Sequence, residues 1–507
     1  MRKRTLLFLI LLFSCLMQAA EDLMRFRIYL KDKQSTAADG YAAFRSSDEQ
    51  PGMGKSVPEL SQVSIQRRQN QGISFDHTDY PVSATYLKIL REKNFPVVTQ
   101  SRWMNTVVVS APDSSCLDTL LSLSFVKSVQ LVWRNPSKEA TTSGKMALTQ
   151  IKSETDSSSI YGKADAQIHL LNLDLLHHQG YQGANKMIAV IDGGFYGVDS
   201  MFWFKKTSLV AVRDFIYPAS SIYKGHPHGT SVLSIMAANE KYAFMGAAPA
   251  AKYCLLRTED IFSEFPIEED YWAAAAEFAD SIGADIISSS LGYSEFDMAE
   301  LSYRQSQLDG NTAFVTRAAS MAASKGILVV CSAGNDGAKP WQKISFPADS
   351  KNVLTVGSVQ PDLFRCSFSS VGPTADGRIK PDVMALGSNL YIVNGSGDLT
   401  VGNGTSFSTP LIAGMAACLW EAFPHLKASE IMQVIKEGGN RALNPDSLYG
   451  FGIPDIGKVM LTLGASFPRP GEKMTEKKPY MTISPLSDPV GILLSEKKAC
   501  FQPDIIH

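Results

Sequence analysis

Short apolar runs alternate with helical segments through the second half of the chain, and this alternation limits the fold more than any other feature. Lys186 to Ile191 and Gly326 to Cys331 have the length and composition of strands buried on both faces. Tyr271 to Asp280, which is rich in alanine, and Phe314 to Ser324 have the composition of helices between such strands. The pattern predicts an α/β fold in which a parallel sheet is covered by helices on both faces.

The most distinctive motif follows the last part of this pattern. Residues 404–410 have the sequence GTSFSTP and run directly into an apolar segment, Leu411 to Ala417. We place Pro410 in the first turn of a helix, where a backbone N–H would lack a partner in any case. The positive end of the helix dipole would then lie beside the hydroxyl of Ser406. Ser406 is therefore a candidate nucleophile, provided that a histidine and a carboxylate lie elsewhere in the chain.

Both partners occur, each within a distinctive local sequence pattern. Asp192 directly follows an apolar run and precedes two glycines, and open α/β sheets place functional groups at this end of a strand. His228 begins the sequence HGTS, after which apolar residues follow at helical spacing. His226 competes with His228 as a base, but it precedes a proline in a predicted loop, so His228 is favoured. The chain order is Asp, His, Ser.

With these three blocks in this order, the chain resembles the subtilisin-like serine proteases, the subtilase or peptidase S8 family. The resemblance extends roughly from Ile168 to Leu463. It implies a subtilisin-like sheet and a serine endopeptidase that works through an acyl-enzyme. In that scheme Ser406 is the nucleophile, His228 is the general base, and Asp192 orients the histidine and stabilises its charged form.

Two further blocks match the family. Asn335, in the sequence SAGNDG after a predicted strand, corresponds to the family's oxyanion-binding asparagine, and the backbone N–H of Ser406 would be the second donor. The family also pairs a substrate backbone with a Ser-Leu-Gly edge and lines the neighbouring pocket with a second short segment. The substrate-binding residues implied by this resemblance are Ser290, Leu291, Gly292, Ser332, Ala333 and Gly334.

The N-terminus has the pattern of a secretory signal peptide, which we assign to residues 1–20. Arg2 to Arg4 are basic, the apolar stretch after them is too short to span a bilayer, and Ala19-Ala20 offers small residues for cleavage. We therefore expect a secreted or cell-envelope protein. Lipid attachment at Cys15 is the alternative, and the bulky Phe13 disfavours it.

Residues 21–145 are predicted to form a separate α+β unit. The expected strands are Arg25–Lys31, Trp103–Val109 and Val126–Trp133. The expected helices are Ala84–Lys93 and Cys116–Leu121. The family resemblance makes this unit a propeptide that inhibits the protease until it is cut off, so the protein would be a self-processed zymogen. An accessory binding domain is the alternative.

The remaining domain boundaries follow from composition. Residues 146–165 are expected to form a polar linker open to cleavage, residues 166–463 the peptidase domain, and residues 464–507 a C-terminal tail without an assigned role. The chain is 507 residues long, which allows this division.

Composition excludes some partners and leaves others open. The net charge of −2 gives no electrostatic reason to expect nucleic acid or an anionic membrane as a partner, and no other segment is apolar enough to span a bilayer. Polypeptide substrates and the chain's own propeptide are the expected partners. No cofactor is expected to be required. Structural calcium is common in the family, but no ligand set can be matched to positions here.

The remaining histidines and cysteines considered as possible metal ligands are expected to have structural roles instead. His177 and His178 lie near the end of a predicted helix and are expected at the surface rather than on a metal. Cys331 and Cys418 lie within apolar segments and are expected to be buried thiols, and no disulfide is required.

Two alternatives to an active protease remain. The first is a catalytically inactive relative that binds peptides without cutting them, and the intact set of Asp192, His228, Asn335 and Ser406 disfavours it. The second is a lipase or esterase, in which the order is Ser, Asp, His and the serine lies in a Gly-x-Ser-x-Gly elbow. Both the order here and the lack of a second glycine at Ser408 disfavour that class.

Overall fold

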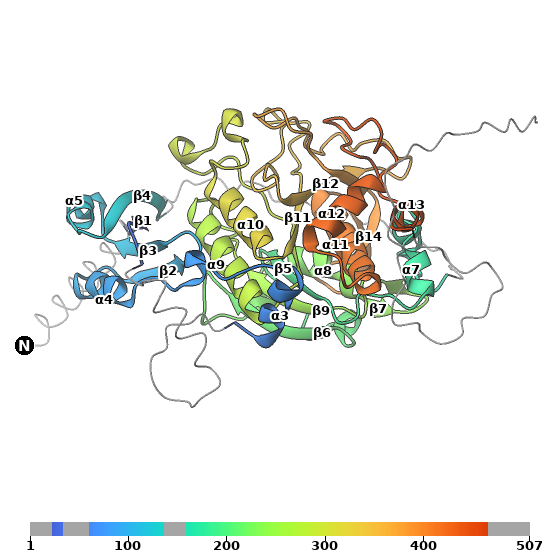
Figure 1. Cartoon of the computed structure of the whole chain (residues 1–507), viewed down its shortest axis with the longest axis horizontal. Helices are drawn as coiled ribbons and strands as arrows, with labels where there is room; N and C mark the ends of the chain where they lie inside the picture. The colour runs from blue at the N-terminus through green and yellow to red at the C-terminus, as the bar shows by residue number, and fades with distance from the viewer. Residues whose placement is uncertain (1–22, 34–59, 136–158, 465–507) are drawn as a thin grey trace, which may run out of the picture.

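The computed structural model describes residues 23–33, 60–135 and 159–464, which form two packed units (Figure 1). The predicted signal peptide with Cys15, most of the predicted linker and the predicted tail beyond Gly464 lie outside these residues. The larger unit contains a seven-stranded parallel sheet in the order β13-β12-β11-β10-β5-β9-β6. Its strands are β5 (Met187–Asp192), β6 (Ser208–Asp214), β9 (Lys252–Arg257), β10 (Ile286–Ser289), β11 (Leu328–Ser332), β12 (Val353–Val359) and β13 (Val383–Leu386).

Helices cover both faces of this sheet, which confirms the predicted α/β fold. Ile188 and Val190 of β5 pack in one core with α8 (His228–Ala237) and α11 (Thr405–Ala422). Ala189 and Ile191 face a second core with α9 (Ile267–Ile282) and α10 (Phe314–Ser324). Successive residues alternate because side chains along a strand point to opposite faces. The helix predicted at Phe314 to Ser324 matches α10, and the one predicted at Tyr271 to Asp280 lies within α9.

Smaller elements complete the larger unit. The α8 and α11 side also includes α6 (Asp165–His169), α7 (Asp174–His178), α12 (Ala428–Glu437) and α13 (Ile456–Thr462). Two short hairpins pair β7 (Asn239–Glu240) with β8 (Phe244–Met245), and β14 (Leu390–Val393) with β15 (Leu399–Gly402). The single-turn 3₁₀ helices of this unit are η4 (Phe202–Phe204), η5 (Ile222–Lys224), η6 (Ala299–Leu301) and η7 (Gln305–Gln307).

The smaller, N-terminal unit is an antiparallel sheet with helices, as predicted for an α+β unit. Its strand order is β2-β3-β1-β4. The strands are β1 (Met24–Leu30), β2 (Val97–Ser101), β3 (Thr106–Ala111) and β4 (Val126–Arg134), and the helices are α3 (Gln62–Asn70), α4 (Ala84–Glu92), α5 (Leu117–Leu121), η2 (His77–Asp79) and η3 (Ser114–Cys116). Leu90 of α4 and Leu120 of α5 share a core with one face of the sheet.

The predicted strand from Trp103 to Val109 is wrong at its start. The structure has a turn at residues 102–105, with Asn105 in the left-handed region at φ 51°, and β3 begins only at Thr106. β2 precedes this turn and pairs with β3, and the sequence prediction missed it. Trp103 is apolar because its side chain is buried in the core formed by α9 and α10 of the larger unit, and not because it belongs to a strand.

The second missed element is α3. Its sequence, QVSIQRRQN, has no apolar face of helical spacing, and its buried residues are Ser64, Arg67 and Arg68. This helix therefore packs through charged groups rather than through an apolar stripe, which is why its sequence pattern did not indicate a helix.

The two units are joined by buried ion pairs on α9. The Arg27 guanidinium of β1 contacts both carboxylate oxygens of Asp270, with Nε–Oδ1 and Nη2–Oδ2 distances of 2.8 and 2.6 Å. It also lies 3.7 Å from the centroid of the Phe314 ring in α10. Glu277 of α9 accepts hydrogen bonds from Ser101 Oγ and from the backbone N–H groups of residues 102 and 103.

A second group of ion pairs joins α3 and η2 to the larger unit. Arg67 and Arg68 each contact one carboxylate oxygen of Asp280 at 2.5 Å. Arg68 also contacts Asp79, whose other oxygen lies 3.0 Å from the Nζ of Lys325. All five side chains are almost completely buried. Figure 1 shows α3 lying against the α9 side of the larger unit.

We predict that Asp280→Ala strongly destabilises the uncleaved full-length chain. The change leaves Arg67 and Arg68 buried without their shared carboxylate, and breaking such a pair typically costs about 3–5 kcal/mol. Urea unfolding of the purified chain, carrying Ser406→Ala so that it stays uncleaved, measures the loss. Glu92→Ala is the control, because its pair with Lys88 is exposed and should change the free energy of unfolding by less than about 0.5 kcal/mol. Equal effects of the two substitutions would contradict the prediction.

Candidate active site

Asp192 and His228 meet at the carboxyl end of β5. Asp192 is the last residue of the strand and is fully buried, and His228 is the first residue of α8. The Nδ1 atom of His228 lies 2.9 and 3.0 Å from the two carboxylate oxygens of Asp192. Asp192 Oδ1 also accepts a hydrogen bond from the backbone N–H of Gly193 at 2.7 Å. The carboxylate thus fixes the imidazole so that its Nε2 edge faces away from Asp192.

The glycine turn after β5 is required by close packing. Gly194 has φ of 146°, and a Cβ atom there would overlap with the backbone N of His226. Its carbonyl accepts a hydrogen bond from the N–H of Gly229 at 3.1 Å. The turn therefore lies directly against the start of α8, and this contact positions His228 over Asp192.

Ser406 lies beside this pair at the start of α11. It is the second residue of the helix, after the N-cap Gly404. The ring centroids of His228 and Phe407 are 5.9 Å apart, so the first turn of α11 lies next to the imidazole. Ser406 Oγ is 3.3 Å from the carbonyl oxygen of Ser290, and the hydroxyl of Ser290 donates to the carbonyl of Ser406 at 2.8 Å. The structure thus brings Asp192 and His228 into contact and places the first turn of α11, which carries Ser406, beside the imidazole.

Pro410 lies in the second turn of α11, not in the first turn as predicted. The helix begins at Thr405, so the nucleophile candidate is itself part of the helix. Because proline has no N–H, it cannot bond the carbonyl of the residue four positions earlier, which is Ser406. The hydroxyl of Ser290 supplies the missing donor. This hydrogen bond connects the end of β10 to the start of α11.

The amide of Asn335 has a fixed orientation near the same helix start. Its Oδ1 accepts hydrogen bonds from the backbone N–H and the hydroxyl of Thr405, at 2.9 and 3.0 Å. The Nδ2 group is therefore turned away from Thr405. Within the described residues it has no hydrogen-bond partner, so it is available as a donor beside Ser406.

The two segments predicted to bind substrate follow adjacent strands. Ser290 to Gly292 follow β10, and Ser332 to Gly334 lie at the end of β11, so both lie at the same edge of the sheet. The Ser332 hydroxyl lies 3.4 Å from the carbonyl of Leu291. Within these segments Gly292 is exposed and Gly334 is half-buried, whereas the side chain of Ala333 belongs to the core. A peptide could therefore reach these segments mainly through the two glycines.

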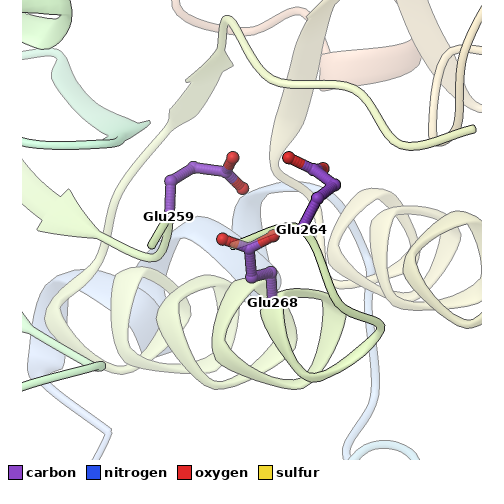
Figure 2. Close-up of side chains that lie close together, drawn as sticks. All are labelled: Glu259, Glu264 and Glu268. Carbon is purple, nitrogen blue, oxygen red and sulfur yellow. The ribbon is translucent and has the colours of Figure 1, made fainter. Parts of the chain in front are cut away.

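Three glutamates that the sequence analysis missed gather near this edge. Glu259 follows β9, Glu268 lies in the first turn of α9, and Glu264 lies in the loop between them (Figure 2). One carboxylate oxygen of each lies within 4.8 Å of the others. The acidic density of residues 259–270 is the sequence signal that could have indicated this cluster.

Two of the three glutamates accept hydrogen bonds from neighbouring residues. The hydroxyl of Tyr293 donates to Glu259 at 2.6 Å, and the N–H of Asp260 donates to Glu268 at 2.5 Å. Burial raises the pKa of Tyr293 well above its usual range, which keeps that hydroxyl protonated as a donor. Calcium takes about six to eight oxygen ligands, so three carboxylates alone do not make a calcium site.

The prediction that His177 lies at the surface is wrong. The residue is buried because α7 packs against α11, and its Nδ1 and Nε2 atoms lie 3.2 and 3.0 Å from the Tyr161 hydroxyl and the Ala247 carbonyl. Burial lowers the pKa of His177 to about 4, so the ring is neutral at pH 7 and holds two core segments together. His178 is exposed, as expected.

The cysteines in the described part of the chain are free and buried, as predicted for Cys331 and Cys418. They are Cys116, Cys254, Cys331, Cys366 and Cys418. Burial raises the pKa of Cys331 to about 12, so its thiol is not reactive at neutral pH.

Comparison with known proteins gives a consistent set of relatives. Residues 183–452 match the Subtilase family, and residues 25–181 match the family described as Peptidase S8 propeptide domain, Bacteroidota. The chain is 30% identical over 291 residues to subtilisin DY from Bacillus licheniformis, which covers 57% of this chain and 96% of that protein. It is 30% identical over 284 residues to subtilisin NAT from Bacillus subtilis subsp. natto, covering 55% of this chain and 67% of the relative.

A solved structure shares the fold. A mutant of the epidermin leader peptide processing serine protease from Staphylococcus aureus has a TM-score of 0.59 and 16% identity, covering 87% of this chain and 99% of that chain. None of the helices in the described ranges has both the length and the apolar character needed to cross a bilayer.

We predict an energetic coupling between Ser290 and Pro410. Ser290→Ala leaves the buried carbonyl of Ser406 without a donor, which typically costs about 1–3 kcal/mol. In a Pro410→Ala background the introduced backbone N–H can bond that carbonyl, so Ser290→Ala should cost less there. A double-mutant cycle measured by urea unfolding gives the coupling. Additive effects of the two substitutions would show that the hydroxyl does not replace the missing helical bond.

Proposed function

The chain belongs to the subtilase family of serine endopeptidases, and from that premise we propose that Asp192, His228 and Ser406 form its catalytic triad. The single observation that carries this proposal is the contact of His228 Nδ1 with both oxygens of the buried Asp192, beside the N-terminus of α11. The bond through Nδ1 leaves Nε2 to act as the base toward Ser406.

The proposed reaction proceeds in two halves. The Ser406 hydroxyl attacks a peptide carbonyl while His228 takes its proton, which gives a tetrahedral intermediate. His228 then gives the proton to the departing amine, the C–N bond breaks, and an acyl-enzyme remains. Water, deprotonated by His228, hydrolyses the ester and releases the acid, and Ser406 regains its proton. Asp192 keeps the ring in the required tautomer and stabilises it when charged.

We propose that Asn335 and the backbone N–H of Ser406 bind the oxyanion. The two hydrogen bonds from Thr405 turn the Asn335 Nδ2 group away from the helix start, which leaves it as a donor beside the nucleophile. Donors fixed in advance need no reorganisation when charge develops on the carbonyl oxygen. The N-terminal end of α11 adds its positive dipole at the same place. The steps use only protons and lone pairs from these groups and water, so we propose that turnover requires no cofactor.

The N-terminal unit supports the proposal of a zymogen. It matches a propeptide family and is held on α9 by buried ion pairs. We propose that the chain cuts itself between Asn135 and Tyr161. The reason is that Trp133 belongs to the smaller unit, whereas Tyr161 is buried in the core of the larger one, together with α6 and α7. The domain boundaries at residues 145, 165 and 463 remain part of this proposal.

The same premise extends to location and to substrates. We propose that the protein is exported with residues 1–20 as a signal peptide, in keeping with the basic and apolar pattern of that segment, and that lipid attachment at Cys15 is the less favoured route. Polypeptides are the proposed substrates, and the N-terminal unit is the proposed intramolecular inhibitor. A catalytically inactive, peptide-binding relative is the alternative function, and nothing in the comparisons favours it.

We predict that Ser406→Ala blocks processing. Wild-type protein should lose its N-terminal unit as seen by intact-mass spectrometry, whereas the variant should keep it, because no acyl-enzyme can form without the hydroxyl. Ser408→Ala is the matched control, since it removes a hydroxyl from the same helix two positions further on. Equal processing of wild type and Ser406→Ala would overturn the self-cleavage proposal. Cleavage of a short-chain ester without cleavage of casein would favour the esterase alternative.

We predict that Asn335→Ala lowers kcat by about 10²–10³, the range that loss of the corresponding donor gives in subtilisin itself. KM should change little because the donor acts mainly on the transition state. Steady-state kinetics on a chromogenic peptide measures both constants. A fall in kcat of less than about threefold, well below this range, would remove Asn335 from the proposed oxyanion site.

A further inference from the structure

His226, which the sequence analysis ranked below His228 as a base, contacts the start of the helix that carries His228. Its Nδ1 atom accepts a hydrogen bond from the backbone N–H of His228 at 3.2 Å. This N–H belongs to the first residue of α8, where no earlier turn of the helix provides an acceptor. The N-cap residue, Pro227, makes no side-chain cap bond, so His226 supplies the acceptor instead.

The backbone of His226 is held by the turn after β5. A Cβ atom on Gly194 would lie 2.4 Å from the backbone N of His226, so the two chain segments are in direct contact. The carbonyl of Gly194 also accepts the N–H of Gly229, the second residue of α8. Each of the first two N–H groups of the helix is therefore held from outside it, one by the turn that follows Asp192 and one by a ring packed against that turn.

The acceptor at His226 exists only while its ring is neutral. Because the donor is a backbone N–H, Nδ1 must carry a lone pair, which places the proton of the neutral ring on Nε2. A second proton, on Nδ1, turns the acceptor into a donor that faces another donor. The bond to the N–H of His228 is then lost, and the start of α8 loses one of these two partners.

Positive charge near His226 opposes this second proton. The centroids of the His226 and His228 rings are 6.4 Å apart, so two charged rings here would repel each other. The N-terminal end of α8 adds positive partial charge at the same place. Lys224 of η5, which is exposed, lies two residues earlier in the same loop.

Acidic groups on the neighbouring elements favour the second proton. They are Asp192, which is bonded to His228, and Glu259 of the glutamate cluster. A Cβ atom on Gly193 would lie 3.4 Å from the Cβ of Glu259 and 4.0 Å from the Cβ of His226, so both side chains start close to the same glycine. The two rings lie in one field of opposing charges, and protonation of one affects protonation of the other.

We propose that His226 is a positioning residue for the general base: in its neutral form it fixes the start of α8 and with it the ring of His228, and its protonation releases that hold. This inference rests on the proposed function. It makes the loss of activity at acidic pH depend on two histidines, the base itself and the residue that holds the helix of the base. Activity therefore falls more steeply with falling pH than a single ionisation allows.

The test is the pH dependence of kcat/KM for a chromogenic peptide, compared between wild type and His226→Asn. An asparagine side chain can bond a backbone N–H two residues on, and it does not titrate. On the acidic side, the logarithm of kcat/KM should fall with a limiting slope of about two in the wild type and about one in the variant. At about pH 8 the variant should keep kcat/KM within about threefold of wild type, because the acceptor is retained.

His226→Leu separates positioning from titration. Leucine has a similar size but no acceptor, so kcat at about pH 8 should fall by about tenfold with little change in KM. Both constants are referred to the concentration of sites titrated with a fluorophosphonate, so a variant that folds poorly still gives a result. His178→Asn is the control, because it removes an exposed histidine at the end of α7 and should leave the slope and both constants unchanged.

Two outcomes would overturn the role of His226. A wild-type slope in His226→Asn would show that the ring does not contribute to the pH dependence. A wild-type kcat in His226→Leu would show that the ring does not hold the base in place. Failure of the wild type to cleave any peptide or to react with a fluorophosphonate would instead overturn the proposed function.

Discussion

The buried carboxylate of Asp192 is the constraint on which the site depends. A charged group with no exposure to water must be paired, and here His228 and the N–H of Gly193 provide the pairing. This requirement fixes the glycine turn after β5, the start of α8 and the direction of the imidazole. Because the strands of the sheet are parallel, their carboxyl ends meet at one edge, and the segments that carry Ser290 and Asn335 leave the sheet there. Hydrogen bonds from these two segments hold the start of α11, with Ser406, at the same place.

A different kind of pairing holds the N-terminal unit on the protease. The contacts of Arg27 with Asp270, and of Arg67 and Arg68 with Asp280, are buried ion pairs across the boundary. Such pairs add little net stability compared with apolar packing, but breaking one is costly, so they favour a single docked arrangement. Trp103 adds the apolar part of the contact. The N-terminal unit is therefore held mainly at α9 and α10, the helices that pack against the face of the sheet opposite α11.

Sequence patterns predicted the fold and the triad candidates because both depend on local signals. Wholly apolar strand runs indicated the parallel sheet, and each of the three triad candidates lies in a short segment with its own glycine or helix signal. The features that were missed depend on distant partners. Examples are α3, which packs through arginines on Asp280, and His177, which is buried because α7 contacts α11. Pro410 is likewise accommodated in the second turn because the hydroxyl of Ser290, which follows another element, bonds the carbonyl that the proline leaves without a helical donor.

The most direct test of the central claim is to map the adduct of a fluorophosphonate probe by peptide mass spectrometry. We expect a single adduct on Ser406 in the processed wild-type protein, and a loss of nearly all labelling in His228→Ala, because the hydroxyl is a weak nucleophile without its base. An adduct on another residue, or labelling of His228→Ala at the wild-type rate, would contradict the account of the site.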